Sequence, residues 1–192
     1  MEEKNSRVIH LAGGCFWGME HLMQSIHGVI DAQCGYANGH EGAEASYHAV
    51  CGGQTGFRET VRVEYDMDKV SLEKLLFIFF AVIDPTVFER QGPDIGSQYQ
   101  TGIYYSDDTS REIIECIAAL ERAEYGRRFY VEIEELKNFY PAEEYHQDYL
   151  VKNPDGYCHI NPAKIKLLST LDFSAAEYTK SAALILRDKT AE

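Results

Sequence analysis

Two spacings of apolar residues organise the chain, and each spacing predicts one kind of element. Apolar and polar residues alternate strictly over 59–65, which predicts a strand with one buried face. Large apolar residues recur at helical spacing over 72–83, where Ser71 suits the N-cap and Pro85 lies just beyond the end. This is the strongest helix signal in the sequence, and its aromatic stripe is typical of a helix that faces a core.

The remaining segments continue this mixture of strands and helices. Further strands are predicted at 8–12, 29–36, 99–105 and 130–135, and further helices at 16–27, 107–126 and 141–151. The order predicts an α+β fold, a two-layer sandwich with a mixed central sheet covered by helices, as a variant of the ferredoxin-like plait. We expect one domain over 1–162 and a helical tail of unassigned role over 163–192.

A glycine-rich hexapeptide, residues 13–18 (GGCFWG), joins the first predicted strand to the first predicted helix. Glycines at such a joint permit a tight turn and the close approach of another molecule. Free amide groups and the positive end of the helix dipole favour a thiolate at Cys15. The alternative is that Cys15 is a small packed hydrophobic residue, which is common for free cysteines.

Glu59 has the same parity as Val61 and Val63, so its carboxyl group is expected on the core side of the strand. Desolvation there raises a carboxyl pKa and keeps the group protonated near neutral pH. The alternative is a frayed strand end with a solvated Glu59. Two irregular segments, 37–57 with Tyr47 and 86–98 before Tyr99, are expected near Cys15 at one end of the sheet.

The second informative thiol is Cys158, in the turn-rich segment 153–159. Such a segment is typically exposed and mobile, so it could bring Cys158 to another sulfur. An incidental surface thiol is the alternative. Together these groups suit nucleophilic attack by sulfur on an electrophile whose oxygen must gain protons. A second thiol could then convert the resulting sulfenic acid into a disulfide.

Composition narrows the possible functions. The net charge of −13 among 192 residues argues against binding to nucleic acid or to an anionic membrane. The N-terminus lacks the apolar run of a signal peptide, and the longest apolar run, 75–83, is too short to span a bilayer. A cytoplasmic location is therefore expected. The five cysteines show no paired spacing, which disfavours a zinc site or a disulfide scaffold.

Five blocks of residues, in one order, carry a resemblance to a known family: 14–18 (GCFWG), 47–59 (YHAVCGGQTGFRE), 84–86 (DPT), 94–99 (DIGSQY) and 142–158 (with AEEYHQDYL and KNPDGYC). On these motifs, spread over residues 7–162, the chain resembles the A-type peptide methionine sulfoxide reductases. The first block looks like the nucleophile motif of that family. The resemblance implies an enzyme that reduces methionine S-sulfoxide, protein-bound or free, to methionine.

The resemblance also implies roles for single residues. Cys15 would attack the sulfoxide sulfur, and Glu59 would protonate the sulfoxide oxygen. Tyr47 and Tyr99 would hold that oxygen by hydrogen bonds. Cys158 would resolve the sulfenic acid on Cys15, and thioredoxin would reduce the disulfide. No metal or organic cofactor is implied.

Three further residues would contact the substrate. Phe16 and Trp17 would hold its S-methyl group in an apolar pocket. Asp94 is similar to an acidic residue of the family near the substrate backbone, and a turn-capping role is the alternative. The chain departs from the family at Phe57 and Gln100, where many members carry His and Arg, and no cysteine follows Cys158.

Two other functions remain open on the residues alone. A thiol peroxidase could use the same pair of Cys15 and Cys158, and it would consume hydrogen peroxide and ignore methionine sulfoxide. A zinc-binding or peptide-binding module could use Cys51, Cys158, His146 and His159, although their spacing is not typical of zinc sites. The three other cysteines receive no role and are expected to be packed or incidental: Cys34, Cys51 and Cys116.

Overall fold

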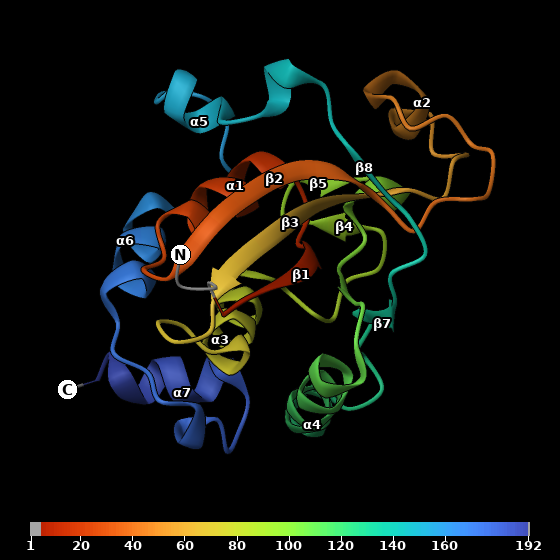
Figure 1. The fold of residues 1–192 in the computed structure, drawn as a ribbon. Coiled ribbons are helices and arrows are strands. Elements are labelled where there is room, and N and C mark those ends of the chain that lie inside the picture. The colour runs from red at the N-terminus through yellow and green to blue at the C-terminus, as the bar shows by residue number, and fades with distance from the viewer. Residues whose placement is uncertain (1–4, 192) are drawn as a thin grey trace.

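A six-stranded mixed sheet forms the centre of the structure, a computed structural model that describes residues 5–191 (Figure 1). Its strands are, in chain order, β1 (Ser6–Ala12), β2 (Val29–Ala37), β3 (Arg58–Asp66), β6 (Gly102–Tyr105), β7 (Glu132–Glu135) and β8 (Phe139–Pro141). Across the sheet the order is β7-β6-β1-β3-β2-β8. β6 and β7 are parallel, and the other neighbouring pairs are antiparallel.

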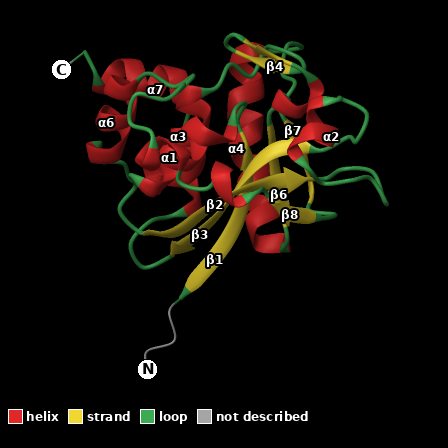
Figure 2. Cartoon of the chain, turned by 90° about the horizontal axis from the view of Figure 1, so that it is seen from above, coloured by secondary structure: helices red, strands yellow, loops and turns green. Residues whose placement is uncertain are grey.

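The helices are α1 (Phe16–Gln24), α2 (Tyr47–Cys51), α3 (Leu72–Val82), α4 (Asp108–Tyr125), α5 (Tyr149–Lys152), α6 (Pro162–Thr170) and α7 (Ala182–Lys189). Of these, α1, α3, α6 and α7 gather on one side of the sheet, whereas α2 lies apart from them (Figure 2). A small two-stranded ribbon, β4 (Arg90–Gln91) and β5 (Asp94–Ile95), lies within the second irregular segment. Within residues 5–191, no helix is both long and apolar enough to cross a membrane.

The four central strands explain the fold class. They follow the order β1-α1-β2-β3-α3-β6 along the chain and β6-β1-β3-β2 across the sheet. Alternation of strands and helices in this β-α-β-β-α-β order is that of the ferredoxin-like arrangement, here widened by β7 and β8 at the two edges. The predicted α+β class with a mixed sheet and a covering layer of helices is confirmed.

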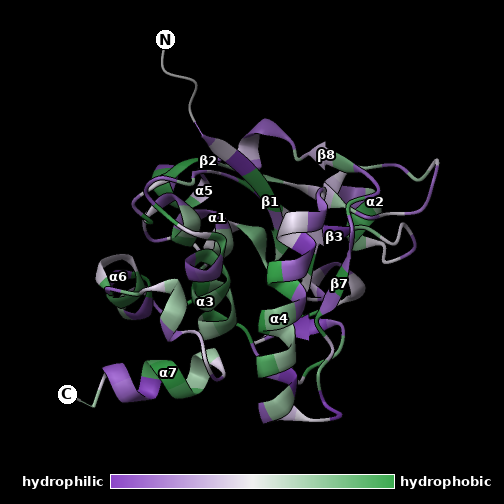
Figure 3. Ribbon diagram, turned by 60° about the horizontal axis from the view of Figure 1, so that its bottom comes forward, coloured by the Kyte–Doolittle hydropathy of each residue, from purple (hydrophilic) through white to green (hydrophobic). Residues whose placement is uncertain are grey.

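Strand parity decides which side chains face the helices. Val61 and Val63 of β3 are fully buried in the core beneath α1 and α3, as the alternation predicts. Glu59 lies on the same face with 2% of its surface exposed. Apolar and polar stripes likewise run along α4 (Figure 3), which buries Ile114 and Ile117 and leaves Cys116 exposed. Of the two alternatives for Cys116, the packed thiol is wrong, because the residue lies on the outward face of that helix, and the incidental surface thiol remains.

Three predicted elements differ from the structure. The predicted helix over 141–151 is wrong: Pro141 ends strand β8, and only a short 3₁₀ turn and α5 follow. Asp148 has a left-handed backbone, φ 55°, which no continuous helix contains. The irregular segment 37–57 contains the short helix α2. Tyr99 ends a 3₁₀ turn, so the strand predicted from that residue begins at Gly102.

The C-terminal extension packs onto the domain through α3 and α4. The ring of Phe173 stacks on that of Phe77 with centroids 4.4 Å apart. The Tyr178 hydroxyl donates to Glu121 Oε1 of α4 at 2.6 Å, and the amide of Ala182 donates to the same oxygen at 2.7 Å. The hydrophobic core therefore continues past residue 162 into both helices of the extension.

Candidate active site

Cys15 lies at the joint of β1 and α1, as the hexapeptide predicts. It occupies the N-cap position of α1 and is buried, with 6% of its surface exposed. Gly14 makes the turn with a φ of 86°, a conformation that strongly favours glycine. A Cβ on Gly14 would lie 2.6 Å from Cβ of Gln91, so the glycine also permits the second irregular segment to approach the turn.

The thiol of Cys15 is held in its neutral form. Burial raises its pKa far above the ordinary value, and the charge of Glu59 acts in the same direction. The amides of Trp17 and Gly18 lower the pKa, as expected for the start of a helix, but their effect is smaller. The predicted thiolate is therefore wrong for the resting site, because desolvation outweighs the helix end.

Glu59 is a buried acid directly beside this joint. Its Oε2 accepts a hydrogen bond from the amide of Phe16 at 3.0 Å. Burial raises the pKa of Glu59 to about 8, with a contribution from the charge of Asp94, and the Phe16 amide opposes this shift. The carboxyl group therefore carries a proton at neutral pH and can donate it. The alternative of a frayed, solvated strand end is wrong.

Tyr47 and Tyr99 both lie near Cys15 and Glu59. Burial raises the pKa of both Tyr47 and Tyr99, and the charges of Glu59 and Cys15 contribute to each shift. Both phenols therefore keep their hydrogen and can donate it. Tyr47 opens α2 and also shares a side-chain hydrogen bond with the exposed Cys51, one turn later. The two irregular segments thus meet at Cys15, as predicted.

His146 and Tyr149 pack against the aromatic pair that follows Cys15, Phe16 and Trp17. The Phe16 ring is almost fully buried, with its centroid 5.0 Å from that of His146. Trp17 stacks on Tyr149 with centroids 3.7 Å apart, and its Nε1 donates to Nδ1 of His146 at 3.1 Å. His146 and Tyr149 therefore orient the tryptophan. Sequence reasoning missed this role, because it placed them on a helix that does not form.

A further missed residue, Glu143, holds the segment that carries Tyr47. One carboxylate oxygen accepts from the backbone amide of Tyr47 at 2.8 Å, and the other accepts from the hydroxyl of Tyr36 at 2.8 Å. The hydrogen bonds keep the pKa of Glu143 below its ordinary value although burial acts against this. Because the partners are about a hundred residues away in sequence, no local pattern could have shown this contact.

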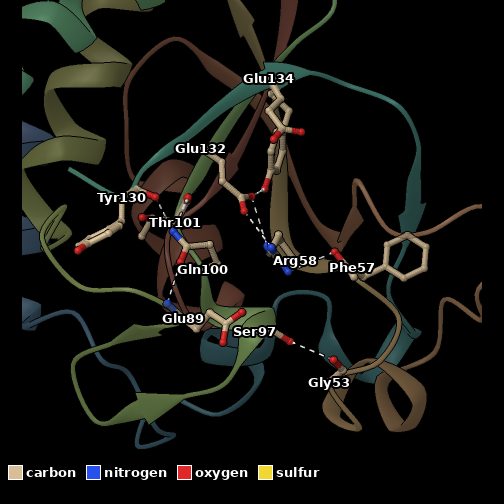
Figure 4. A network of polar contacts seen from close by, with 12 residues as sticks. Gly53, Phe57, Arg58, Glu89, Ser97, Gln100, Thr101, Tyr130, Glu132 and Glu134 are labelled. Atoms are coloured by element: carbon tan, nitrogen blue, oxygen red, sulfur yellow. Dashed lines mark hydrogen bonds and ion pairs between the residues drawn. The ribbon is translucent and has the colours of Figure 1, made fainter. Parts of the chain in front are cut away.

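A polar network supports the segment that carries Tyr99 (Figure 4). Buried Gln100 accepts from the amide of Glu89 at 2.7 Å and donates to the carbonyl of Tyr130 at 2.7 Å. Arg58 forms an ion pair with Glu132 at 2.8 Å nearby. Gln100 thus links three chain segments through an uncharged amide. Phe57, the other departure from the family pattern, is buried, and its ring packs at a right angle to that of Tyr140.

The segment around Cys158 lies against the start of α1. The Tyr157 hydroxyl donates to Oδ2 of Asp94 at 2.7 Å, and Nε2 of His159 lies 3.0 Å from the carbonyl oxygen of Gly13. Between these contacts, the half-buried Cys158 places Sγ 3.2 Å from where a Cβ on Gly18 would be. The second thiol is therefore beside the first turn of the helix that begins after Cys15.

The zinc-binding alternative finds no support in this arrangement. Across residues 5–191, no group of three or more His, Cys, Asp or Glu side chains is placed to hold a metal ion. The five cysteines are unpaired, with Cys34 buried and Cys51 and Cys116 exposed.

Comparison with known proteins identifies the family. The model of the family described as peptide methionine sulfoxide reductase matches residues 7–175. The peptide methionine sulfoxide reductase MsrA of Alkaliphilus metalliredigens is 54% identical over 155 residues, 81% of this chain and 98% of that protein.

Solved structures agree with this match. Reduced Mxr1 of Saccharomyces cerevisiae is 38% identical and covers 83% of this chain and 93% of its own, with a TM-score of 0.77. Methionine sulfoxide reductase A of Corynebacterium diphtheriae is 35% identical over 82% and 79% of the two chains, with a TM-score of 0.71. Mxr1 in complex with Trx2 is similar at 25% identity over 77% and 87% of the two chains, with a TM-score of 0.54. The chain therefore belongs to the peptide methionine sulfoxide reductase family.

Proposed function

We propose that the chain reduces methionine S-sulfoxide, in oxidised proteins or free, to methionine. The observation that carries this proposal is the protonated acid beside the thiol: Glu59 is buried, has a pKa of about 8 and accepts from the amide next to Cys15. A sulfoxide oxygen becomes a leaving group only when it gains protons, so a nucleophilic sulfur needs such an acid. Tyr47 and Tyr99 supply two further donors.

In the first step, Sγ of Cys15 attacks the sulfoxide sulfur. Glu59 gives its proton to the sulfoxide oxygen, and the proton of the Cys15 thiol restores the carboxyl group. Transfer of the oxygen to Cys15 then leaves methionine and a cysteine sulfenic acid, with no net proton change. Phe16 and Trp17 would contact the S-methyl group, and Asp94 would accept from the substrate backbone once Tyr157 leaves it.

In the second step, Cys158 attacks the sulfenic sulfur of Cys15, a disulfide forms and water leaves. Thioredoxin then reduces the disulfide by thiol–disulfide exchange and supplies the two electrons of the cycle. The complex of the yeast relative Mxr1 with Trx2 supports this partner. No metal or organic cofactor enters these steps. A reducing cytoplasm, which we propose as the location, would keep the five unpaired cysteines as thiols.

The test uses separated S and R diastereomers of a methionine sulfoxide peptide with thioredoxin, thioredoxin reductase and NADPH. The wild-type protein should reduce the S form only, and Cys15→Ser should reduce neither. Cys158→Ser should release about one methionine per enzyme and then stop, because the sulfenic acid persists. Cys116→Ser, on the outward face of α4, is the matched control and should retain full activity.

A different result would separate this proposal from its nearest competitor. Activity of Cys15→Ser would end the assignment of the nucleophile. Rapid consumption of hydrogen peroxide, without reduction of either diastereomer, would instead indicate a thiol peroxidase that uses the same cysteine pair.

A further inference from the structure

His159 lies between Cys158 and the backbone just before Cys15, and it takes no part in the two reaction steps proposed for the cysteines. Its Nε2 is 3.0 Å from the carbonyl oxygen of Gly13. A carbonyl oxygen can only accept a hydrogen bond, so Nε2 carries the hydrogen. In a neutral ring Nδ1 then has the free lone pair, and the contact with Gly13 selects this tautomer.

The free nitrogen of His159 points toward the first turn of α1. Nδ1 is buried and has no hydrogen-bond partner among residues 5–191. A Cβ on Gly18 would lie 3.0 Å from this nitrogen and 3.2 Å from Sγ of Cys158. The basic nitrogen and the thiol sulfur thus lie over the same point of the helix, where glycine leaves room for both.

Cys158 needs a proton acceptor in order to attack. Burial raises the pKa of its thiol above the ordinary value. In the structure its Sγ lies 3.1 Å from the carbonyl oxygen of Ile160, a contact in which the thiol donates its hydrogen. Burial lowers the pKa of His159 and outweighs the opposing effects of the Gly13 hydrogen bond and of the Asp94 charge, so the ring is neutral at pH 7. A neutral imidazole beside a neutral thiol is the pairing that general-base catalysis requires.

We propose that His159 docks the resolving segment through Gly13 and accepts the Cys158 proton at Nδ1 during disulfide formation. This inference rests on the proposed function. The Cys158 sulfur forms a bond to the sulfenic sulfur of Cys15, and the sulfur–oxygen bond of the sulfenic acid breaks. The proton passes from Cys158 through Nδ1 to the departing hydroxide, which leaves as water. Cys158 is oxidised, Cys15 is reduced from the sulfenic to the disulfide level, and no external reductant is needed.

His21 of α1 is the competing proton acceptor. It lines, together with Cys158, a pocket of about 230 Å³, and its Nδ1 is also buried without a partner among the described residues. The titratable groups near His159 are Cys158 and Asp94, and His21 shares a pocket with Cys158. No described hydrogen bond fixes the tautomer of His21, whereas Gly13 fixes that of His159. This difference favours His159.

The experiment follows one turnover with one equivalent of methionine S-sulfoxide and no reductant, and it measures methionine and disulfide separately. The disulfide is counted by mass after acid quench and alkylation of free thiols. His159→Gln keeps a donor for Gly13 but has no basic nitrogen, and His159→Phe loses both. We expect methionine to form at the wild-type rate in both variants. At pH 7, disulfide formation should slow about 100-fold in His159→Gln and further in His159→Phe.

The pH profile separates proton transfer from docking. The deficit of His159→Gln should shrink as pH rises, because Cys158 then ionises without help. His21→Gln should form the disulfide at the wild-type rate. Normal disulfide formation in His159→Gln at pH 7, a deficit that does not change with pH, or a deficit confined to His21→Gln would overturn the inference. Failure of the wild-type protein to form methionine would instead overturn the proposed function.

Discussion

The two thiols of the site are held in opposite ways. Cys15 stands where β1 meets α1, so a strand and a helix fix its position, and its sulfur is almost fully buried. Cys158 lies between α5 and α6 in a segment without regular structure. Side-chain contacts at Tyr157 and His159 hold that segment in place. Backbone elements therefore position the first thiol, and contacts that can break and re-form position the second.

The fixed position of Cys15 suits the reduction of the sulfoxide, and the more loosely held position of Cys158 suits the formation of the disulfide. Attack on a sulfoxide needs Cys15, Glu59 and the phenols in one fixed geometry, because small displacements reduce the rate strongly. Disulfide exchange needs a thiol that reaches Cys15 and later becomes accessible to another protein. Segments held by a few surface contacts open at low free-energy cost, whereas core elements do not. Three substitutions test this contrast, the first on the fixed side and the others on the adjustable side.

The largest effect is expected for Glu59→Gln. The variant cannot supply the proton, so single-turnover methionine formation should fall by about 100- to 10,000-fold. In the wild-type protein this rate should fall as pH rises through about 8, where Glu59 loses its proton. Glu20→Gln is the matched control, because Glu20 is also buried, with a pKa raised to about 7, but contacts Asp148 instead. An equal loss in Glu20→Gln would indicate a general structural defect.

Glu59→Gln should increase the stability of the protein at pH 8, although it decreases the activity. Glu59 has a higher pKa folded, about 8, than its ordinary value of 4.5, so the unfolded chain loses the proton first as pH rises. The free energy of unfolding should therefore decrease between these two pH values. At pH 8 we expect Glu59→Gln to be more stable than wild type by about 4 kcal/mol in urea unfolding, with little difference at pH 4.

An intermediate effect is expected for Gly18→Ala. The added methyl would lie 3.0 Å from the His159 ring and 3.2 Å from Sγ of Cys158, which pushes the resolving segment away from α1. Disulfide formation should slow roughly tenfold, while methionine formation in the first turnover stays normal. Alanine favours a helix by about 1 kcal/mol over glycine, so thermal unfolding should show no loss of stability. Equal loss of both steps would contradict the contrast.

The smallest effect is expected for Tyr157→Phe. This variant removes the hydrogen bond to Asp94 and keeps the ring. Because the contact is exposed, its loss should cost about 1 kcal/mol and slow disulfide formation about fivefold. The double variant with His159→Gln reports whether the two contacts act together, because independent contacts give multiplicative effects. A larger loss than that of Gly18→Ala would mean that Tyr157, not the helix surface, positions the thiol.

Local patterns predicted the parts of the site that backbone elements position. Alternation along β3 placed Glu59 on the core face, and the change from strand to helix spacing placed Cys15 at the joint. The periodicity of α3 predicted its buried face equally well, because every Leu, Ile and Phe of that helix is buried. These signals work because strand and helix periods follow from backbone geometry alone.

Local patterns failed where distant residues decide the structure. The helix predicted over 141–151 does not form because Pro141 pairs with β2 and Asp148 turns left-handed. The helix end predicted a thiolate at Cys15, but burial in the fold and the charge of Glu59, which is far away in sequence, raise its pKa. The roles of Glu143 and His146 in holding Tyr47 and Trp17 likewise depend on contacts across the fold.

The neutral state of the two thiols has a consequence for survival of the protein under oxidising conditions. Hydrogen peroxide and other soluble oxidants react with thiolates far more readily than with thiols. Both sulfurs keep their hydrogen at rest, since burial raises the pKa of Cys15 and of Cys158. A bound sulfoxide supplies its own acceptor for the Glu59 proton, and the charged carboxylate can then take the Cys15 hydrogen. Reactivity thus arises in the presence of the damaged residue, and without a bound sulfoxide the two sulfurs of the site are poor targets for soluble oxidants.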